Sequence, residues 1–314
     1  MGCEAKPRST IINLKTNTMR TPTLLIHHGA YQPLWQQIGL IQVGPRISDG
    51  PASLRLMDLS VAELRNALLR RGWASKGVLI QYTDPFLLRA APMRGIRQWP
   101  GPRLLACGDL HHGPDPVGTL QQYCAAEPHD AVLLTFNPAL LQNVQQRLPM
   151  PVRCLAPTFF RYPTATPSPR PRLELLHVGS LGPHHPRRRQ LVEGLLKRQE
   201  VPLRHATTAN ADEAAWLYAQ HALVLNVPLN QDLNHRLFEV MAAGVPQLIF
   251  GDRKLLGDNS PLTNRPDLLW ANSIEELEAL VQKLFANPYK LKSIPVEPPP
   301  YWELKALLKA ALAP

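Results

Sequence analysis

The chain alternates short apolar runs with segments of helical periodicity. In its first half, strands are expected at 24–26, 78–82, 103–107, 131–134 and 152–155. Segments of helical character lie at about 60–71, 117–126 and 138–147. Strands that alternate with helices are typical of βαβ units in a parallel sheet. The pattern therefore predicts an α/β fold.

A proline-dense stretch over 163–171 interrupts the alternation, because so many prolines fit neither a helix nor a strand. The pattern then restarts. Strands are expected at 173–178, 202–206, 222–227 and 247–250, with helices at about 187–198, 212–220 and 235–243. We predict a loose tail over 1–22, a first Rossmann-like domain over 23–165, a second over 172–295, and a C-terminal helix or tail over 296–314.

Two of the expected helices carry boundary signals of their own. Ser60 and Glu63 form a capping-box pattern at the start of the first helix, and Gly72 stands where that helix should stop. Ser273 and Glu276 repeat the capping box near the end of the chain. These positions predict where helices begin and end.

Positive charge is concentrated in the first half of the chain. The net charge is +10, and residues 1–170 hold 18 Lys and Arg against 9 Asp and Glu, whereas the remainder holds 16 against 15. This imbalance indicates either an anionic partner, such as a phosphate, an acidic glycan or a membrane surface, or only a well-solvated surface. Aromatic residues are few and not interleaved with basic ones, so no nucleic-acid partner is expected.

The cysteines and the apolar runs bear on where the protein works. Cys3, Cys107, Cys124 and Cys154 form no CxxC pair, so neither a zinc ribbon nor a redox motif is indicated. No run of 18 apolar residues is present, and the first six residues lack the apolar core of a secretion signal. A cytoplasmic protein is expected.

The turn from Gly179 to Gly182 is the first candidate site. It follows an expected strand, and glycines there allow the backbone to approach a phosphate at the start of the next helix. Ser180 lies in the turn, and Arg187 lies at the helix entry with other cations. The competing interpretation is that the glycines only close a βα turn.

The second candidate site follows the strongly apolar run 222–227. A polar loop there leads into Asn234 and Arg236, and Glu239 lies early in the following short helix. A carboxylate can accept hydrogen bonds from a ribose diol, Arg236 can bind a diphosphate, and Asn234 can reach a sugar hydroxyl. The alternative is that Glu239 only stabilises the helix start through the helix dipole.

The stretch Asn234-x-Arg236-x-Phe238-Glu239-x-x-Ala242-x-Gly244-x-Pro246 resembles the donor-site motif of GT-B glycosyltransferases, and most of all the spore-maturation-type, group 1 proteins. The segment from Trp270 to Leu277 also resembles the C-terminal domain of that family. Good resemblance covers about residues 173–290.

The resemblance implies a metal-independent hexosyltransferase with two Rossmann-like domains facing across a cleft. Its donor substrate would be a nucleotide-diphosphate sugar, and no other cofactor or metal is implied. Glu239 would hold the ribose, and Arg236 and Asn234 would complete the donor pocket. The full implied donor set is Gly179, Ser180, Arg187, Asn234, Arg236, Glu239 and Gly244. Retaining members often carry an acid eight residues before the ribose glutamate, where this chain has Gln231 followed by Asp232, so the stereochemistry stays open.

The third candidate site is Asp109, His111 and His112, which follow the expected strand 103–107. Asp109 can orient a histidine that acts as general base toward an acceptor hydroxyl. Structural hydrogen bonding and metal binding are the competing interpretations. His27 and His28 occupy a similar strand-to-loop junction.

The predicted function is glycosyl transfer from a nucleotide-diphosphate sugar to an unidentified acceptor, which the basic first half suggests is anionic, with contact to an anionic membrane as a further expectation. A catalytically silent nucleotide-sugar-binding protein and a nucleotide-sugar epimerase of the same fold are the alternatives.

Overall fold

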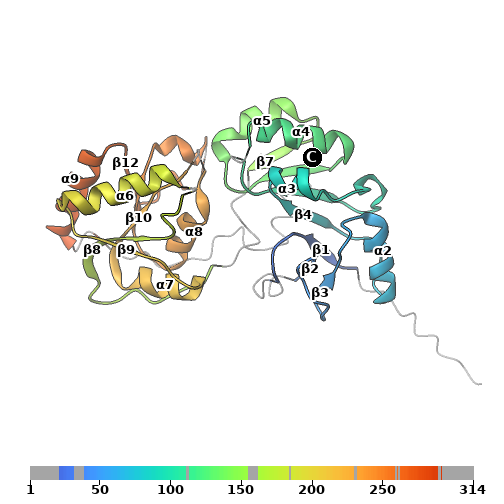
Figure 1. Cartoon of the computed structure of the whole chain (residues 1–314), viewed down its shortest axis with the longest axis horizontal. Helices are drawn as coiled ribbons and strands as arrows, with labels where there is room; N and C mark the ends of the chain where they lie inside the picture. Colours follow the sequence, from blue (N-terminus) through green and yellow to red (C-terminus); the bar gives the residue numbers. More distant parts are fainter. Residues whose placement is uncertain are drawn as a thin grey trace, which may run out of the picture.

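The computed structural model describes residues 21–31, 39–110, 113–154, 162–183, 185–229, 232–258, 260, 262–288 and 291. Two parallel sheets organise these residues, each in its own α/β region (Figure 1). Parallel sheets with helical crossovers are what the alternating sequence pattern predicts. The α/β fold class with two Rossmann-like regions is therefore confirmed.

The first sheet has seven strands in the order β3-β2-β1-β4-β5-β6-β7, all paired in parallel. The strands are β1 (Thr23–Ile26), β2 (Leu40–Gly44), β3 (Ser53–Arg55), β4 (Leu79–Thr83), β5 (Arg103–Cys107), β6 (Ala131–Leu134) and β7 (Val152–Cys154). Its described helices are α2 (Val61–Arg70), α3 (Pro85–Ala90), α4 (Pro116–Ala126) and α5 (Leu141–Arg147), with the 3-10 turns η1 (Ile96–Gln98) and η2 (Pro138–Leu140).

The second sheet has five parallel strands in the order β12-β11-β10-β8-β9. They are β8 (Arg172–Val178), β9 (Leu203–Ala206), β10 (His221–Asn226), β11 (Gln247–Phe250) and β12 (Leu268–Ala271). The helices are α6 (Pro186–Arg198), α7 (Ala211–Ala219), α8 (Asn234–Ala242) and α9 (Ile274–Phe285), with the 3-10 turn η3 (Arg253–Leu256).

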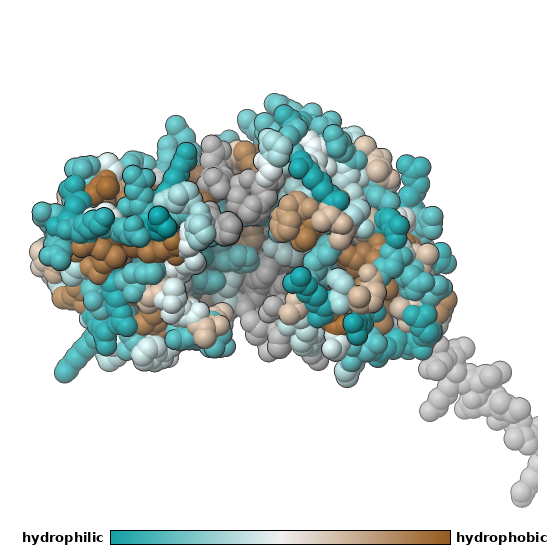
Figure 2. Space-filling model, viewed as in Figure 1, coloured by the Kyte–Doolittle hydropathy of each residue, from teal (hydrophilic) through white to brown (hydrophobic). Residues whose placement is uncertain are grey.

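Both faces of the first sheet are buried, which explains its nearly continuous apolar strands. In β1, Leu24 and Ile26 pack into one apolar cluster with α2, while Leu25 packs into a second cluster on the other face. Polar residues cover much of the outer surface of both regions, with apolar residues in scattered patches (Figure 2).

Three strands and one helix are not predicted by the sequence pattern. The strand β2 is buried at all five positions and contains Gln42, so it shows no alternation that would distinguish it from a loop. The strand β3 has only three residues, and β12 and α3 are short as well. Pairing with neighbouring strands, rather than local sequence preference, determines such elements.

The predicted helix boundaries are confirmed at both capping boxes. The Oγ of Ser60 accepts the Glu63 N–H at 3.3 Å, and the Oγ of Ser273 accepts the Glu276 N–H at 3.1 Å. Gly72 has a φ of +66° just after α2, as a helix-ending glycine does. Among the described residues, no helix combines the length and apolar character needed to cross a membrane.

Loss of the Ser273 cap is expected to destabilise the second region. The variant Ser273→Ala removes the acceptor for the Glu276 N–H and should lower the free energy of unfolding by about 1 kcal/mol. Urea titration followed by circular dichroism measures this value. An unchanged midpoint would show that α9 does not depend on this cap.

Candidate active site

The carboxyl ends of the parallel strands bring the candidate residues together. In the second sheet, β8 ends at Gly179 and β10 ends at the loop that precedes α8. In the first sheet, β4 and β5 lead into Asp84 and Asp109. Ligands of open α/β sheets bind at this edge, where loops and helix N-termini converge.

A cleft of about 270 Å³ lies between the two regions. Its lining from the first region consists of Tyr82, Asp84, Asp109 and Phe136. Its lining from the second region consists of His185, Arg188, Leu229, Asp232, Asn234 and His235. The cleft therefore has an N-terminal wall with two carboxylates and a C-terminal wall with the Arg188 guanidinium and the Asp232 carboxylate.

The side chain of Arg236 lies directly against the backbone of Gly179. A Cβ at position 179 would overlap the Arg236 guanidinium, and the φ of +135° there also disfavours any other residue. Within the described part of the chain, Nε and Nη1 of Arg236 are buried and have no hydrogen-bond partner. Two buried guanidinium donors beside an open backbone turn are suited to binding an anion.

His205 holds the same turn from behind. Its Nε2 lies 2.8 Å from the Gly179 carbonyl oxygen, and its ring stacks on that of His177. Burial, together with the Arg236 charge, lowers the pKa of His177 to about 3, so this ring is neutral. The turn is thus fixed by side chains beneath it while its other side stays open.

A second guanidinium, that of Arg188 in the first turn of α6, lies near enough to Arg236 for the two charges to interact. It is buried and donates from Nε and Nη2 to the Val227 carbonyl oxygen, at 3.3 and 3.1 Å. Burial and the nearby positive charge of Arg236 lower the pKa of Arg188 to about 10, and Asp232 opposes the shift. Two cations that repel each other in a partly dry site are stabilised by a bound anion.

Buried amides fix the start of α8. Asn226 accepts a hydrogen bond from Asn234 at 2.9 Å and donates to Gln247 at 3.3 Å. Gln247 in turn donates to the Leu237 carbonyl oxygen at 2.9 Å. Because Asn226 and Gln247 are fully buried, this network locks α8 onto β10 and β11 and thereby positions Arg236.

Glu239 lies in the middle of α8, not early in it as the sequence suggested. The Tyr218 hydroxyl donates to its Oε2 at 3.1 Å. Burial raises the pKa of Glu239, while Arg236 and the Tyr218 hydrogen bond oppose the shift. The helix dipole acts on charges in the first and last turns of a helix. A carboxylate in the middle of α8 is therefore not explained by the helix dipole.

Three residues of the implied donor set have structural explanations. Asn234 accepts the Leu237 N–H at 3.2 Å and bonds Asn226, so its amide organises the helix start. Gly244 ends α8 with a φ of +69°, at the opposite end of the helix from the cleft. Ser180 accepts the Gly182 N–H at 3.0 Å and is exposed.

The structure places Arg188, and not the predicted Arg187, in the cleft lining. Arg187 is exposed on α6. The sequence contained the necessary signal, because Arg188 shares the buried stripe of α6 with Leu191, Val192 and Leu195. Helical phase would have selected the correct arginine.

The N-terminal wall is organised around two carboxylates. The Asp84 Oδ1 accepts the Asp109 N–H at 2.7 Å, and both residues line the cleft. The Tyr82 pKa is raised by burial and by the negative charges of Asp84 and Asp109, so its hydroxyl stays protonated. Sequence reasoning missed Asp84 because an Asp before Pro85 resembles an ordinary turn.

Several predicted residues do not enter this description. His111, His112 and Gln231 lie outside the described residues. His28 is described, and its Nε2 lies 3.0 Å from the Ala91 carbonyl oxygen. Burial lowers the pKa of His27 to about 4, and neither of these two histidines lines the cleft.

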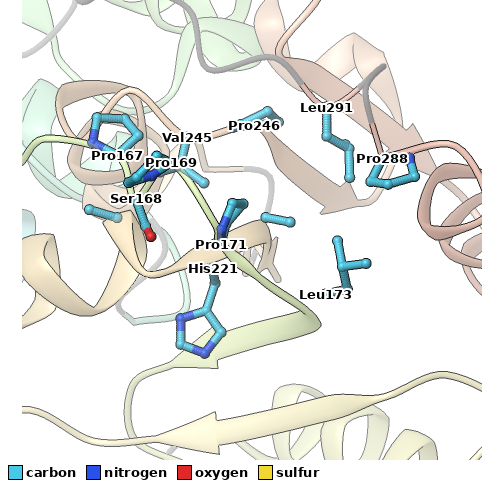
Figure 3. A pocket seen from close by; sticks show the side chains of 12 residues that line it. Pro167, Ser168, Pro169, Pro171, Leu173, His221, Val245, Pro246, Pro288 and Leu291 are labelled. Carbon is cyan, nitrogen blue, oxygen red and sulfur yellow. The ribbon is translucent and has the colours of Figure 1, made fainter.

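A larger cavity of about 630 Å³ lies away from this chemistry (Figure 3). It is bounded by prolines of the linker, by Leu173 near the start of β8 and by His221 at the start of β10. The linker here means the described residues 162–171, which lie between β7 and β8. Because the strands are parallel, this cavity sits at the opposite edge of the sheet from Gly179. The smaller cleft is lined by Asp109, which among the candidate catalytic residues is the one that the structure describes.

Comparison with known families agrees with this geometry. Residues 171–295 match the family model described as "Glycosyl transferase-like". Within the solved structures, TarM from S. aureus covers 74% of this chain with a TM-score of 0.50 at 10% identity, and 53% of TarM is covered. The chain has a GT-B glycosyltransferase fold. The resemblance inferred from the Asn234–Pro246 motif is thereby confirmed.

Two further solved structures are similar at lower scores. The "Glycosylation Associate Protein (Gap123) complex" from Streptococcus agalactiae gives a TM-score of 0.47 at 12% identity, covering 73% of this chain and 52% of that one. The glycotransferase of kitacinnamycin gives a TM-score of 0.42 at 11% identity, covering 86% of this chain and 92% of that one. The chain spans about half the length of TarM and of the Gap123 chain. No curated protein matches the chain.

A methyl group at position 179 is expected to weaken anion binding. In Gly179→Ala the new Cβ displaces the Arg236 guanidinium, so the affinity for a nucleoside diphosphate should fall at least about tenfold, the loss of one charged hydrogen bond. Calorimetry measures the Kd. The matched control is Gly182→Ala, whose Cβ meets only the flexible Ser180 hydroxyl and should change the Kd less than about twofold. Equal effects at both positions would contradict the assignment.

Replacement of Gly244 is expected to lower stability without changing the affinity for a nucleoside diphosphate. Gly244→Ala places a side chain at a φ of +69° and should cost about 1 kcal/mol of unfolding free energy. Because the residue lies at the far end of α8, nucleoside-diphosphate affinity should stay unchanged. Thermal unfolding and calorimetry on the same protein separate the two effects, and a weakened affinity without loss of stability would return Gly244 to the donor site.

Proposed function

We propose that the protein transfers a sugar from a nucleotide-diphosphate sugar to a hydroxyl acceptor held in the cleft. The observation that carries this proposal is a pair of neighbouring guanidiniums: that of Arg236 lies against the Gly179 backbone, and that of Arg188 is near enough to Arg236 for the two charges to interact. The match of residues 171–295 to a glycosyltransferase family supports it.

The donor would bind along the C-terminal wall. The two guanidiniums and the backbone of the turn would hold the diphosphate, and the free oxygen of Glu239 would accept from the ribose diol. The Tyr218 hydroxyl orients this carboxylate through its bond to Oε2. The donor site in this proposal therefore consists of Gly179, Arg188, Arg236 and Glu239.

Transfer requires the acceptor oxygen to attack the anomeric carbon while the sugar–phosphate bond breaks. The nucleoside diphosphate leaves with the electron pair, and Arg188 and Arg236 stabilise its growing charge. These cations can do the work of a divalent metal, so we propose a metal-independent reaction. Asp109 on the facing wall would take the acceptor proton, directly or through a neighbouring histidine.

The proposal also includes an anionic acceptor, or contact with an anionic lipid surface, because the first half of the chain carries most of the net positive charge. Of its 18 Lys and Arg, four lie in residues 1–20. Several others form surface pairs with acids, as Arg94 does with Asp58 and Arg103 with Asp130. The remaining excess would act as a long-range attraction for a negatively charged substrate.

Donor binding is expected to depend on the Glu239 carboxylate. A donor at 100 times its Kd should raise the free energy of unfolding by about 2.7 kcal/mol, measured by thermal shift against a panel of nucleotide sugars. Glu239→Gln should lose most of that gain. The exposed Glu193→Gln, from a surface pair with Arg189, is the control and should keep it. A full shift in Glu239→Gln would remove this residue from the site.

Turnover is expected to depend on Asp109 without a matching change in donor binding. Asp109→Asn should reduce kcat by about a hundredfold or more, measured as nucleoside-diphosphate release with screened sugar acceptors and with excess EDTA present. The surface variant Asp58→Asn should retain full activity. Inhibition of the wild-type protein by EDTA would contradict the metal-independent reaction, and an active Asp109→Asn would exclude Asp109 as base.

A further inference from the structure

The segment Thr135–Asn137, which follows β6, contacts both walls of the cleft. On one side it holds the β5 loop of the first region. The Thr135 hydroxyl donates to the Cys107 carbonyl oxygen at 2.8 Å, and the buried Asn137 Oδ1 accepts the Leu110 N–H at 3.2 Å. These bonds flank Asp109, so this segment determines where the Asp109 loop lies.

On its other side the same segment holds the start of α8. The Leu233 N–H donates to the Phe136 carbonyl oxygen at 2.8 Å, immediately before the helix begins. The centroid of the Phe136 ring lies 4.4 Å from the centroid of the His235 ring and 6.2 Å from that of the Phe238 ring. His235 directly precedes Arg236 in the chain. The Phe136 contact therefore lies one residue away from the arginine of the proposed diphosphate site.

The linker completes this contact. The Tyr162 ring stacks on Phe238, and its hydroxyl lies 2.8 Å from Nδ1 of His235. Phe136 and Tyr162 belong to one apolar cluster with Leu233 and Phe238. An apolar cluster drawn from the first region, the linker and the second region restricts hinge motion more than polar contacts would.

We propose that Phe136 is a positioning residue that fixes the acceptor wall against the donor wall. This inference rests on the proposed function for its catalytic consequence. The Phe136 ring contacts His235 and Phe238 on the donor wall, and its chain neighbours Thr135 and Asn137 hold the Asp109 loop. Phe136 thereby sets the separation between the proposed base and the proposed diphosphate site. Reacting groups displaced by about 1 Å can lose about a hundredfold in rate.

In this proposal Phe136 affects the separation between the two walls of the cleft and not the affinity for the donor. All proposed donor ligands lie in the second region, where the amide network of Asn226 and Gln247 also holds the start of α8 and remains when the Phe136 ring is removed. Loss of the ring should therefore reduce kcat and leave the KM for the donor unchanged. A purely structural core residue would instead lower stability with no selective effect on kcat.

The test compares Phe136→Ala with Phe136→Leu and with Val144→Ala. Leucine keeps apolar contact and should restore most of the activity, and it also serves as the readable variant if alanine impairs folding. Val144 is fully buried inside the first region, in the cluster formed by α4, α5 and the strands. Val144→Ala therefore controls for general destabilisation of the same region.

Two measurements are made on each full-length protein. The first is kcat and donor KM, where Phe136→Ala should lose at least about tenfold in kcat with KM within about twofold. The second is the distance between spin labels on cysteines introduced at the exposed positions Arg65 and Gln190, in a background with Cys3→Ser and Cys154→Ser. This distribution should be narrow in the wild type, Phe136→Leu and Val144→Ala, and broad in Phe136→Ala.

A narrow distribution in Phe136→Ala, or an unchanged kcat, would overturn the proposal. The label distances test the positioning role even without turnover. Failure of any donor to stabilise the wild-type protein would instead count against the proposed function, so the two failures are distinguishable.

Discussion

The contact between the Arg236 guanidinium and the backbone of Gly179 is the constraint on which the site depends. A side chain at position 179 would occupy the space of the guanidinium, so the glycine and the arginine require each other. The turn is held from behind by His205, and the arginine is held by a helix whose start is tied to buried Asn226 and Gln247. Positive charge is thus fixed beside open backbone, which is how proteins bind diphosphates without reorganising.

The parallel sheets explain why residues so distant in sequence meet. Each strand delivers its following loop to the same edge, so the Gly179 turn and the start of α8 lie at one edge of the second sheet. The facing region delivers Asp84 and Asp109 to its own edge by the same rule. The segment around Phe136 then joins the two edges, so that the proposed base and the proposed diphosphate site belong to a single arrangement.

Sequence reasoning recovered the alternating fold, because βα periodicity is a local signal, and the spacing from Asn234 to Glu239 pointed to α8, where the candidate donor residues lie. It chose Arg187 where burial on α6 selects Arg188, since charge was considered without helical phase. It gave Gly244 to the donor, although the φ of that residue shows a helix end. Phe136 and Asp84 carried no local signal, because their importance comes from contacts between two regions of the chain.

The most direct test of the account is the affinity of the protein for nucleoside diphosphates compared with the matching monophosphates, measured by calorimetry for the wild type and for Arg236→Met. With UDP, ADP and GDP as ligands, the account predicts that the preferred diphosphate binds the wild type at least about tenfold more tightly than its monophosphate, a difference of about 1.4 kcal/mol. Arg236→Met should lose that preference, while the exposed Arg189→Met should keep it. Equal preference for the second phosphate in wild type and Arg236→Met would contradict the account.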